Sequence, residues 1–103
     1  MNTGVDIIAN ERKRQIEYQG KRPEELCDLS QRHFVKAAMS YCFVENHFRN
    51  QSESNTMPPL LWPFDREFWN PDRNNDIRNL AKAGAYIAAE IDRLLEIEQK
   101  QNP

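Results

Sequence analysis

A long helical repeat of apolar residues near the C-terminus restricts the possible folds of this chain. From residue 72 to about residue 100, apolar and small residues recur at steps of three and four, at Ile77, Leu80, Ala81, Gly84, Ile87, Ala88, Ile91, Leu94 and Leu95. This spacing puts them on one side of an α-helix, and we expect that side to face the core. Glycine inside a helix costs about 1 kcal/mol relative to alanine. We therefore expect Gly84 to admit a close neighbour, with the two tryptophans as candidates.

The predicted length of this helix suggests self-association. A helix of residues 73–99 would be about 40 Å long, whereas a compact sphere of this size is only about 33 Å across. The apolar residues from Leu94 to Ile97 would then extend beyond the domain or pack on another subunit. Because they would otherwise be exposed, we predict a homo-oligomer formed through the long C-terminal helix.

An aromatic, proline-containing segment precedes this helix. The stretch Leu60–Pro71 reads L-L-W-P-F-D-R-E-F-W-N-P and holds both tryptophans of the chain. Asp65 is a suitable N-cap for a short turn or helix through Trp69, and Pro71 prevents its continuation. Two interpretations stay open at this stage. The rings either form a small core that fastens this connection to the long helix, or they form one side of a binding site.

Two further helices complete an all-α prediction. Residues 4–18 have a capping box, Thr3 with Asp6, and an apolar side at Val5, Ile8, Ala9 and Ile16. Arg12 lies on that side, so it needs a carboxylate, backbone carbonyls or an anionic ligand as partner. Residues 29–49 are apolar nearly all round, which is typical of a central helix. We predict a single domain, residues 1–103, that is a small bundle of about three main helices, with residues 50–59 as a flexible loop.

Composition excludes several classes of function. The net charge of −2 gives no basic excess for duplex nucleic acid. No apolar run approaches the ~20 residues that span a bilayer, and no signal peptide is evident, so we expect a cytoplasmic protein. Cys27 and Cys42 are expected to be reduced thiols. His33 and His47 lie about 21 Å apart along one predicted helix, too far to share a metal ion. No phosphate-binding glycine loop or nucleophile motif occurs. We therefore predict no catalytic residue, metal or cofactor.

Basic and aromatic residues together are the best candidates for a binding site. Guanidinium and ammonium groups bind anions, and aromatic rings stack on bases. The predicted ligand-binding residues are Arg12, Arg14, Trp62, Asp65, Trp69 and Lys82. Two alternatives remain. One is a small all-α nucleotide pyrophosphohydrolase that uses carboxylates of the long helix, such as Asp92 and Glu96, to hold magnesium. The other is a structural or adaptor protein with no small-molecule ligand.

Three segments resemble a group of small phage and prophage proteins. They are E-R-K-R-Q-I-E-Y-Q-G at 11–20, W-P-F-D-R-E-F-W-N-P at 62–71 and R-N-L-A-K-A-G-A-Y-I-A-A-E-I-D-R-L at 78–94. The group's acidic, histidine-bearing segment after the first glycine is replaced here by K-R-P-E-E-L-C-D-L. The resemblance implies a viral origin and a host-cytoplasm setting, and no particular reaction. By analogy with other small phage proteins, we expect a protein that sequesters a host nucleotide signal or binds a host protein.

Overall fold

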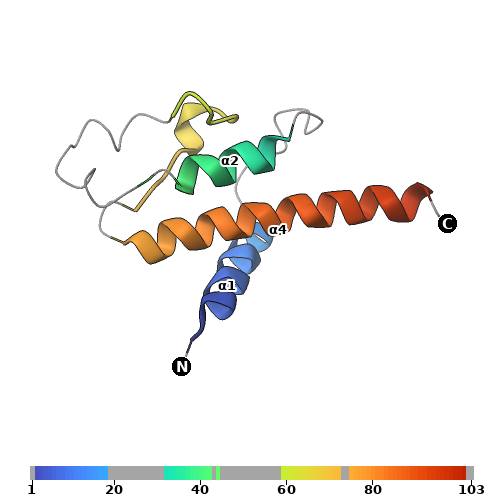
Figure 1. Cartoon of the computed structure of the whole chain (residues 1–103), viewed down its shortest axis with the longest axis horizontal. Coiled ribbons are helices and arrows are strands. Elements are labelled where there is room, and N and C mark those ends of the chain that lie inside the picture. The colour runs from blue at the N-terminus through green and yellow to red at the C-terminus, as the bar shows by residue number, and fades with distance from the viewer. Residues whose placement is uncertain (1, 19–31, 43, 45–58, 73–74, 102–103) are drawn as a thin grey trace.

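A computed structural model describes residues 2–18, 32–42, 44, 59–72 and 75–101 of the protein. Within these ranges the chain is helical and contains no strand, which confirms the all-α prediction. The elements are α1 (Gly4–Glu17), α2 (His33–Cys42), the short 3-10 helix η4 (Arg66–Phe68) and α4 (Asp76–Gln101). α2 runs beside the first half of α4, while α1 crosses α4 steeply on another side (Figure 1). None of the helices in the described ranges is long and apolar enough to cross a membrane.

The capping box predicted at the start of α1 is present. Thr3 Oγ1 accepts the Asp6 backbone N–H at 3.3 Å, and Asp6 Oδ2 accepts the Thr3 backbone N–H at 3.0 Å. These two bonds satisfy two backbone donors that the first turn of a helix otherwise leaves unpaired. The bond from the Thr3 backbone N–H lowers the pKa of Asp6 most, and the Thr3 hydroxyl, which donates to Asp6 Oδ2 at 3.0 Å, lowers it further. α1 therefore begins where the sequence predicts and ends one residue early, at Glu17.

The predicted inward side of α1 is only partly correct. Ile8 is half-buried, but Val5 and Ile16 are exposed because only the middle of this steeply crossing helix reaches α4. A Cβ added to Gly84 would lie 2.7 Å from Cδ1 of Ile8. The close neighbour of Gly84 is thus Ile8, and the expectation that a tryptophan would pack there was wrong.

Arg12 has the carboxylate partner that its place on α1 requires. Its Nη2 lies 3.0 Å from Asp92 Oδ2 on α4, and its Nε donates to the same oxygen at 3.2 Å. Nη1 donates to Gln15 at 3.3 Å. Arg12 therefore links α1 to α4 by a charge-assisted pair at the edge of their contact.

α2 supplies the centre of the core. Its buried residues are Phe34, Ala37, Ala38, Ser40 and Tyr41. They pack against Ala83 and Ala89 of α4 and against the aromatic segment. The predicted span of 29–49 was too long, because Val44 is not helical and donates its N–H to the Tyr41 carbonyl at 3.2 Å.

The aromatic segment packs into this core. Trp62 and Phe64 are buried, and Phe68 and Trp69 are half-buried against the same cluster. The Trp62 indole N–H donates to the Asp65 carbonyl at 3.1 Å, so the buried ring leaves no unpaired donor. η4 spans Arg66–Phe68, within the predicted turn from Asp65 to Trp69. Of the two interpretations, these contacts match the small core that fastens the connection to the rest of the fold.

The large residues in the apolar repeat of α4 do not face the core as predicted, although Ala81 of the same repeat is buried. The buried residues of α4 are Asn79, Ala81, Ala83, Ala85, Ala89 and Glu90. Small side chains allow α1 and α2 to pack closely on two other sides of the helix. Six large residues of the repeat are 43% to 63% exposed, and they are Ile77, Leu80, Ile87, Ile91, Leu94 and Leu95. We call this surface the α4 face. The C-terminal end of α4 also projects beyond the other helices, as its length predicts (Figure 1).

Several sequence-based predictions lie outside the described residues. They concern the connection at residues 20–29, the state of Cys27, the position of His47 and nearly all of the 50–59 loop. Cys42, at the end of α2, is an exposed free thiol.

Candidate functional site

A pocket of about 310 Å³ lies where α1, α2, α4 and the aromatic segment meet. We call it the interhelical pocket. Each element contributes side chains to its lining: Glu11, Arg14, Gln15 and Tyr18 from α1, Tyr41 from α2, Glu67, Phe68 and Asn70 from the segment, and Arg78, Lys82 and Tyr86 from α4. The three residues of α4 are spaced by four, so they form one row along that helix. The pocket therefore depends on the packing of all four elements.

Two arginines of the pocket are held by one glutamate. Oε1 of Glu11 lies 3.0 Å from Arg14 Nη1 and 3.5 Å from Arg78 Nε. The Glu11 side chain is only 12% exposed, whereas Arg14 is 60% exposed. Each guanidinium has five N–H donors, and among the described residues this carboxylate engages only one nitrogen of each. The arrangement holds both cations beside one carboxylate, which among the described residues occupies few of their donors.

Lys82 is a third basic group in the pocket and is partly desolvated. Its Nζ donates to the Asn70 carbonyl at 2.5 Å and lies 5.6 Å from the centre of the Tyr41 ring. Burial lowers the pKa of Lys82, and the nearby positive charge of Arg78 lowers it further. An ammonium held in this state gains from a nearby anion, because the anion replaces part of the lost hydration.

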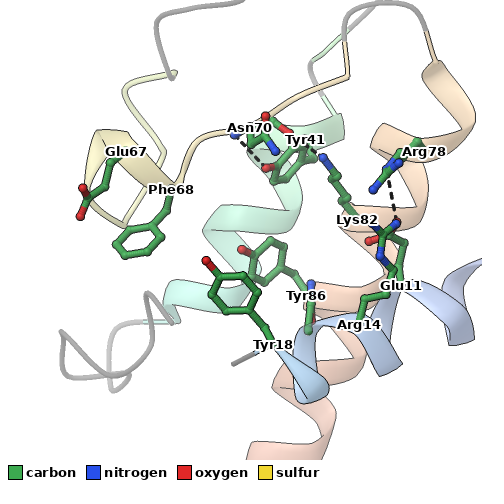
Figure 2. A pocket seen from close by; sticks show the side chains of 11 residues that line it. Glu11, Arg14, Tyr18, Tyr41, Glu67, Phe68, Asn70, Arg78, Lys82 and Tyr86 are labelled. Atoms are coloured by element: carbon green, nitrogen blue, oxygen red, sulfur yellow. Dashed lines mark hydrogen bonds and ion pairs between the residues drawn. The ribbon is translucent and has the colours of Figure 1, made fainter. Parts of the chain in front are cut away.

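Aromatic rings face these cations. Figure 2 shows Tyr18, Phe68 and Tyr86 on one side of the pocket, with Lys82, Arg78 and Arg14 across from them. Tyr41 packs against Tyr86 with ring centres 6.0 Å apart, and its hydroxyl accepts the Asn70 N–H at 3.2 Å. Burial raises the pKa of Tyr41 to about 12. The rings offer flat apolar surfaces beside fixed positive charge, a combination that suits a planar ring carrying an anionic group.

The structure brings two of the six predicted ligand-binding residues to the interhelical pocket. Arg14 and Lys82 line it. Arg12 instead pairs with Asp92. The other three lie in the aromatic segment away from the pocket lining: Trp62 is buried, Asp65 is exposed and Trp69 packs 4.8 Å from the Tyr41 ring. Ligand contacts by any of the six stay a prediction.

Sequence reasoning did not select Arg78, Glu11 or Tyr86 for the binding site. The spacing of these residues along their helices could have indicated them. Arg78, Lys82 and Tyr86 recur every four residues along α4, beside the apolar repeat that dominates the helix. Glu11, Arg14 and Tyr18 recur at steps of three and four on α1. Each set is a polar and aromatic row on one helix side, but only the packing of α1 on α4 shows that the two rows meet.

The carboxylates named for a hydrolase lie elsewhere and bind basic side chains. Asp92 pairs with Arg12, and Glu96 lies 3.8 Å from Lys100. Glu90 accepts two bonds from Arg93, at 2.6 and 3.1 Å, and these bonds lower its pKa. Within the part of the chain that the structure describes, no group of three His, Cys, Asp or Glu residues is arranged to hold a metal ion.

Comparison with known proteins does not identify a function for the interhelical pocket. No protein family matches this chain. No curated protein and no solved structure matches it either. The functional argument therefore depends on the interhelical pocket and on the sequence resemblance described above.

Proposed function

We propose that this protein is a non-enzymatic binding protein that holds a small anionic ligand with a planar ring, such as a nucleotide, in the interhelical pocket. One observation carries the proposal. Arg14, Arg78 and Lys82 border a pocket of about 310 Å³ whose other side is lined by tyrosine and phenylalanine rings. The three cations bind phosphate oxygens, and the rings stack on a base.

The balance of charge within the pocket favours an anion over a cation. Its lining has three basic and two acidic side chains, although the whole chain carries a net charge of −2. Of the two acids, Glu11 already binds both arginines, and Glu67 points away from the basic groups in Figure 2. The volume is at the small end of the range of about 300–1,000 Å³ for ligand pockets. A ligand near the size of one nucleotide fits these conditions better than a long polymer.

The biological setting proposed for this binding comes from the phage resemblance. A phage protein that captures a host nucleotide signal without altering it would act against the host's defence by lowering the free concentration of that signal. The alternative functions are binding of a host protein, nucleotide hydrolysis and a purely structural role, and one experiment separates nucleotide capture from all three.

The test is a thermal shift and calorimetry series with cyclic and linear nucleotides, each with and without magnesium. The comparison includes wild type, Arg78→Met, Lys82→Met and the control Arg66→Met. Arg66 is an exposed arginine of η4 that does not line the pocket. We expect at least one nucleotide to raise the Tm of wild type and of the control. Each pocket variant should lose about tenfold to a hundredfold in affinity, because a charge-assisted bond is removed.

The other outcomes point away from nucleotide capture. Release of product in the presence of magnesium would indicate a hydrolase. No shift with any nucleotide would rule out this class of ligand and favour a protein partner or a structural role. An equal loss of affinity in Arg66→Met would show that general surface charge, and not the interhelical pocket, binds the ligand.

A further inference from the structure

The six large residues of the α4 face are exposed, whereas Ile8 of α1 covers Gly84 of the same repeat. These six residues extend from Ile77 to Leu95, a distance of about 27 Å along the helix. Scattered exposed apolar residues are normal on a protein, but a continuous patch of this kind marks an interaction site. Val5 and Ile16 add exposed apolar area on α1. They lie seven residues before and four residues after Arg12, and Arg12 contacts α4 through Asp92.

The charges that border this surface are neutralised within the chain. Asp92 at one edge pairs with Arg12, and Glu90 at the other edge pairs with Arg93. Between Ile77 and Leu95 the large exposed residues of the face are all aliphatic. The surface suits a partner that is itself an apolar helix.

The order of residues along the face identifies that partner. Ile77 and Leu94 lie equally far from a point midway between Ala85 and Tyr86, and so do Leu80 and Ile91. Gly84 and Ile87 form a third pair about the same point. When the helix is reversed about this point, large residues therefore correspond in the first two pairs, and the small Gly84 corresponds to the large Ile87 in the third. A helix with such a pattern is complementary to itself when turned end for end, which is the condition for a two-fold, isologous contact.

We infer that two copies of this chain associate through an antiparallel pair of α4 helices, with Leu80 of each copy opposite Ile91 of the other. At the centre, Ile87 of one copy meets the Ile8 side chain that covers Gly84 of the second. Lys82 lies two residues after Leu80, which is about 200° around the helix. The interhelical pocket is therefore on the opposite side of α4 from the proposed contact and stays open. The inference goes beyond ligand binding, since each copy keeps its own pocket.

Cysteine cross-linking tests the pairing and its direction together. Two single variants, Leu80→Cys and Ile91→Cys, are made in a full-length background with Cys27→Ser and Cys42→Ser. Helices with axes 8–10 Å apart bring facing Cα atoms to about 4–6 Å, within the range of a disulfide. On mild oxidation we expect a covalent dimer from the mixture of the two variants and little from either one alone. Cross-linking of Leu80→Cys with itself would indicate a parallel pair and overturn the inference.

Mass in solution gives an independent measurement. Light scattering of the wild type at micromolar concentration should give twice the chain mass. Leu80→Lys should weaken the dimer about a hundredfold or more, because the pair would bury an unpaired ammonium group. The matched control is Leu60→Lys, a fully exposed leucine outside α4. Circular dichroism checks that both variants are folded. A monomeric wild type overturns the inference, whether or not the α4 face then binds lipid vesicles.

Discussion

Gly84 lies beneath the side chain of Ile8, and the two residues set how closely α1 approaches α4. A methyl group at this position would come within 2.7, 2.9 and 3.1 Å of three Ile8 carbon atoms. Alanine gains about 1 kcal/mol in helix propensity but meets an overpacking cost of about 1–3 kcal/mol. We expect Gly84→Ala to lower the free energy of unfolding by about 1 kcal/mol.

A double-mutant cycle checks this expectation. Ile8→Ala removes the crowding atoms, so adding Gly84→Ala in that background should stabilise the protein by up to about 1 kcal/mol. Urea denaturation of the four proteins gives the coupling energy. Equal effects of Gly84→Ala in the two backgrounds would show that Ile8 does not limit this site.

Tyr41 makes stability depend on pH in the alkaline range. Burial disfavours the phenolate, so folding raises the pKa of Tyr41 from 10.0 to about 12. The stabilisation is complete below pH 10 and is lost as pH rises toward 12, a change of about 2–3 kcal/mol. We expect wild type to lose more stability across this window than Tyr41→Phe, which has no proton to release. Chemical denaturation of both proteins near pH 10 and near pH 12 measures the two losses of stability. Equal losses would mean that the Tyr41 hydroxyl is accessible to water.

Part of the ion pairing and part of the pocket lining could be predicted from residue types alone. The place of Arg12 on an apolar helix side required a partner, and Asp92 is one of the classes of partner predicted. Arg14 and Lys82 were selected by type and line the pocket. Arg78 was missed because a lone arginine beside an apolar repeat resembles any solvated residue. Its proximity to Glu11 arises from α1 crossing α4, which no local pattern encodes.

Among the elements, the junction between the aromatic segment and α4 depends on one amide. Asn79 is 1% exposed, its Oδ1 accepts the Asp72 N–H and its Nδ2 donates to the Asp72 carbonyl, both at 2.7 Å. Asn79→Ala removes this partner from both backbone groups, so we expect a loss of about 2–4 kcal/mol in the free energy of unfolding.

Chemical denaturation measures this loss against Gln99→Ala, an exposed change on the same helix that should stay within about 0.5 kcal/mol of wild type. A cost for Asn79→Ala no larger than that of the control would show that the segment does not depend on this amide.

α4 also explains where prediction from sequence stopped. The period of three and four correctly gave a long helix, and its predicted length agrees with Asp76–Gln101. The same period does not distinguish a core from an interface, since both bury aliphatic side chains. Here the core side of α4 consists mainly of alanines, because close helix packing needs small residues, while the isoleucines and leucines remain outside. The strongest apolar pattern in the chain was therefore assigned to the wrong side of the fold.

At the scale of the whole molecule, association through α4 should link stability to protein concentration. A dimer that forms only from folded chains is stabilised by mass action. We expect the Tm of the wild type to rise by a few degrees for each tenfold increase in concentration. The Tm of Leu80→Lys should stay constant, and scanning calorimetry at several concentrations makes the comparison. A constant wild-type Tm would contradict association through this face.

The overall architecture was accessible from sequence because each helix carries its own apolar pattern. The interhelical pocket was not, because its lining comes from four segments between residues 11 and 86. Only the relative placement of these segments determines which basic and aromatic side chains share one space.

The packing of Trp62 and Trp69 has an optical consequence. These are the only two tryptophans in the chain, their ring centres are 5.0 Å apart, and both contact Tyr41, which lines the interhelical pocket. All of the indole fluorescence of the protein therefore comes from one cluster next to the pocket. Emission and near-ultraviolet dichroism of the unlabelled protein then become a direct spectroscopic readout of pocket occupancy, without any introduced dye.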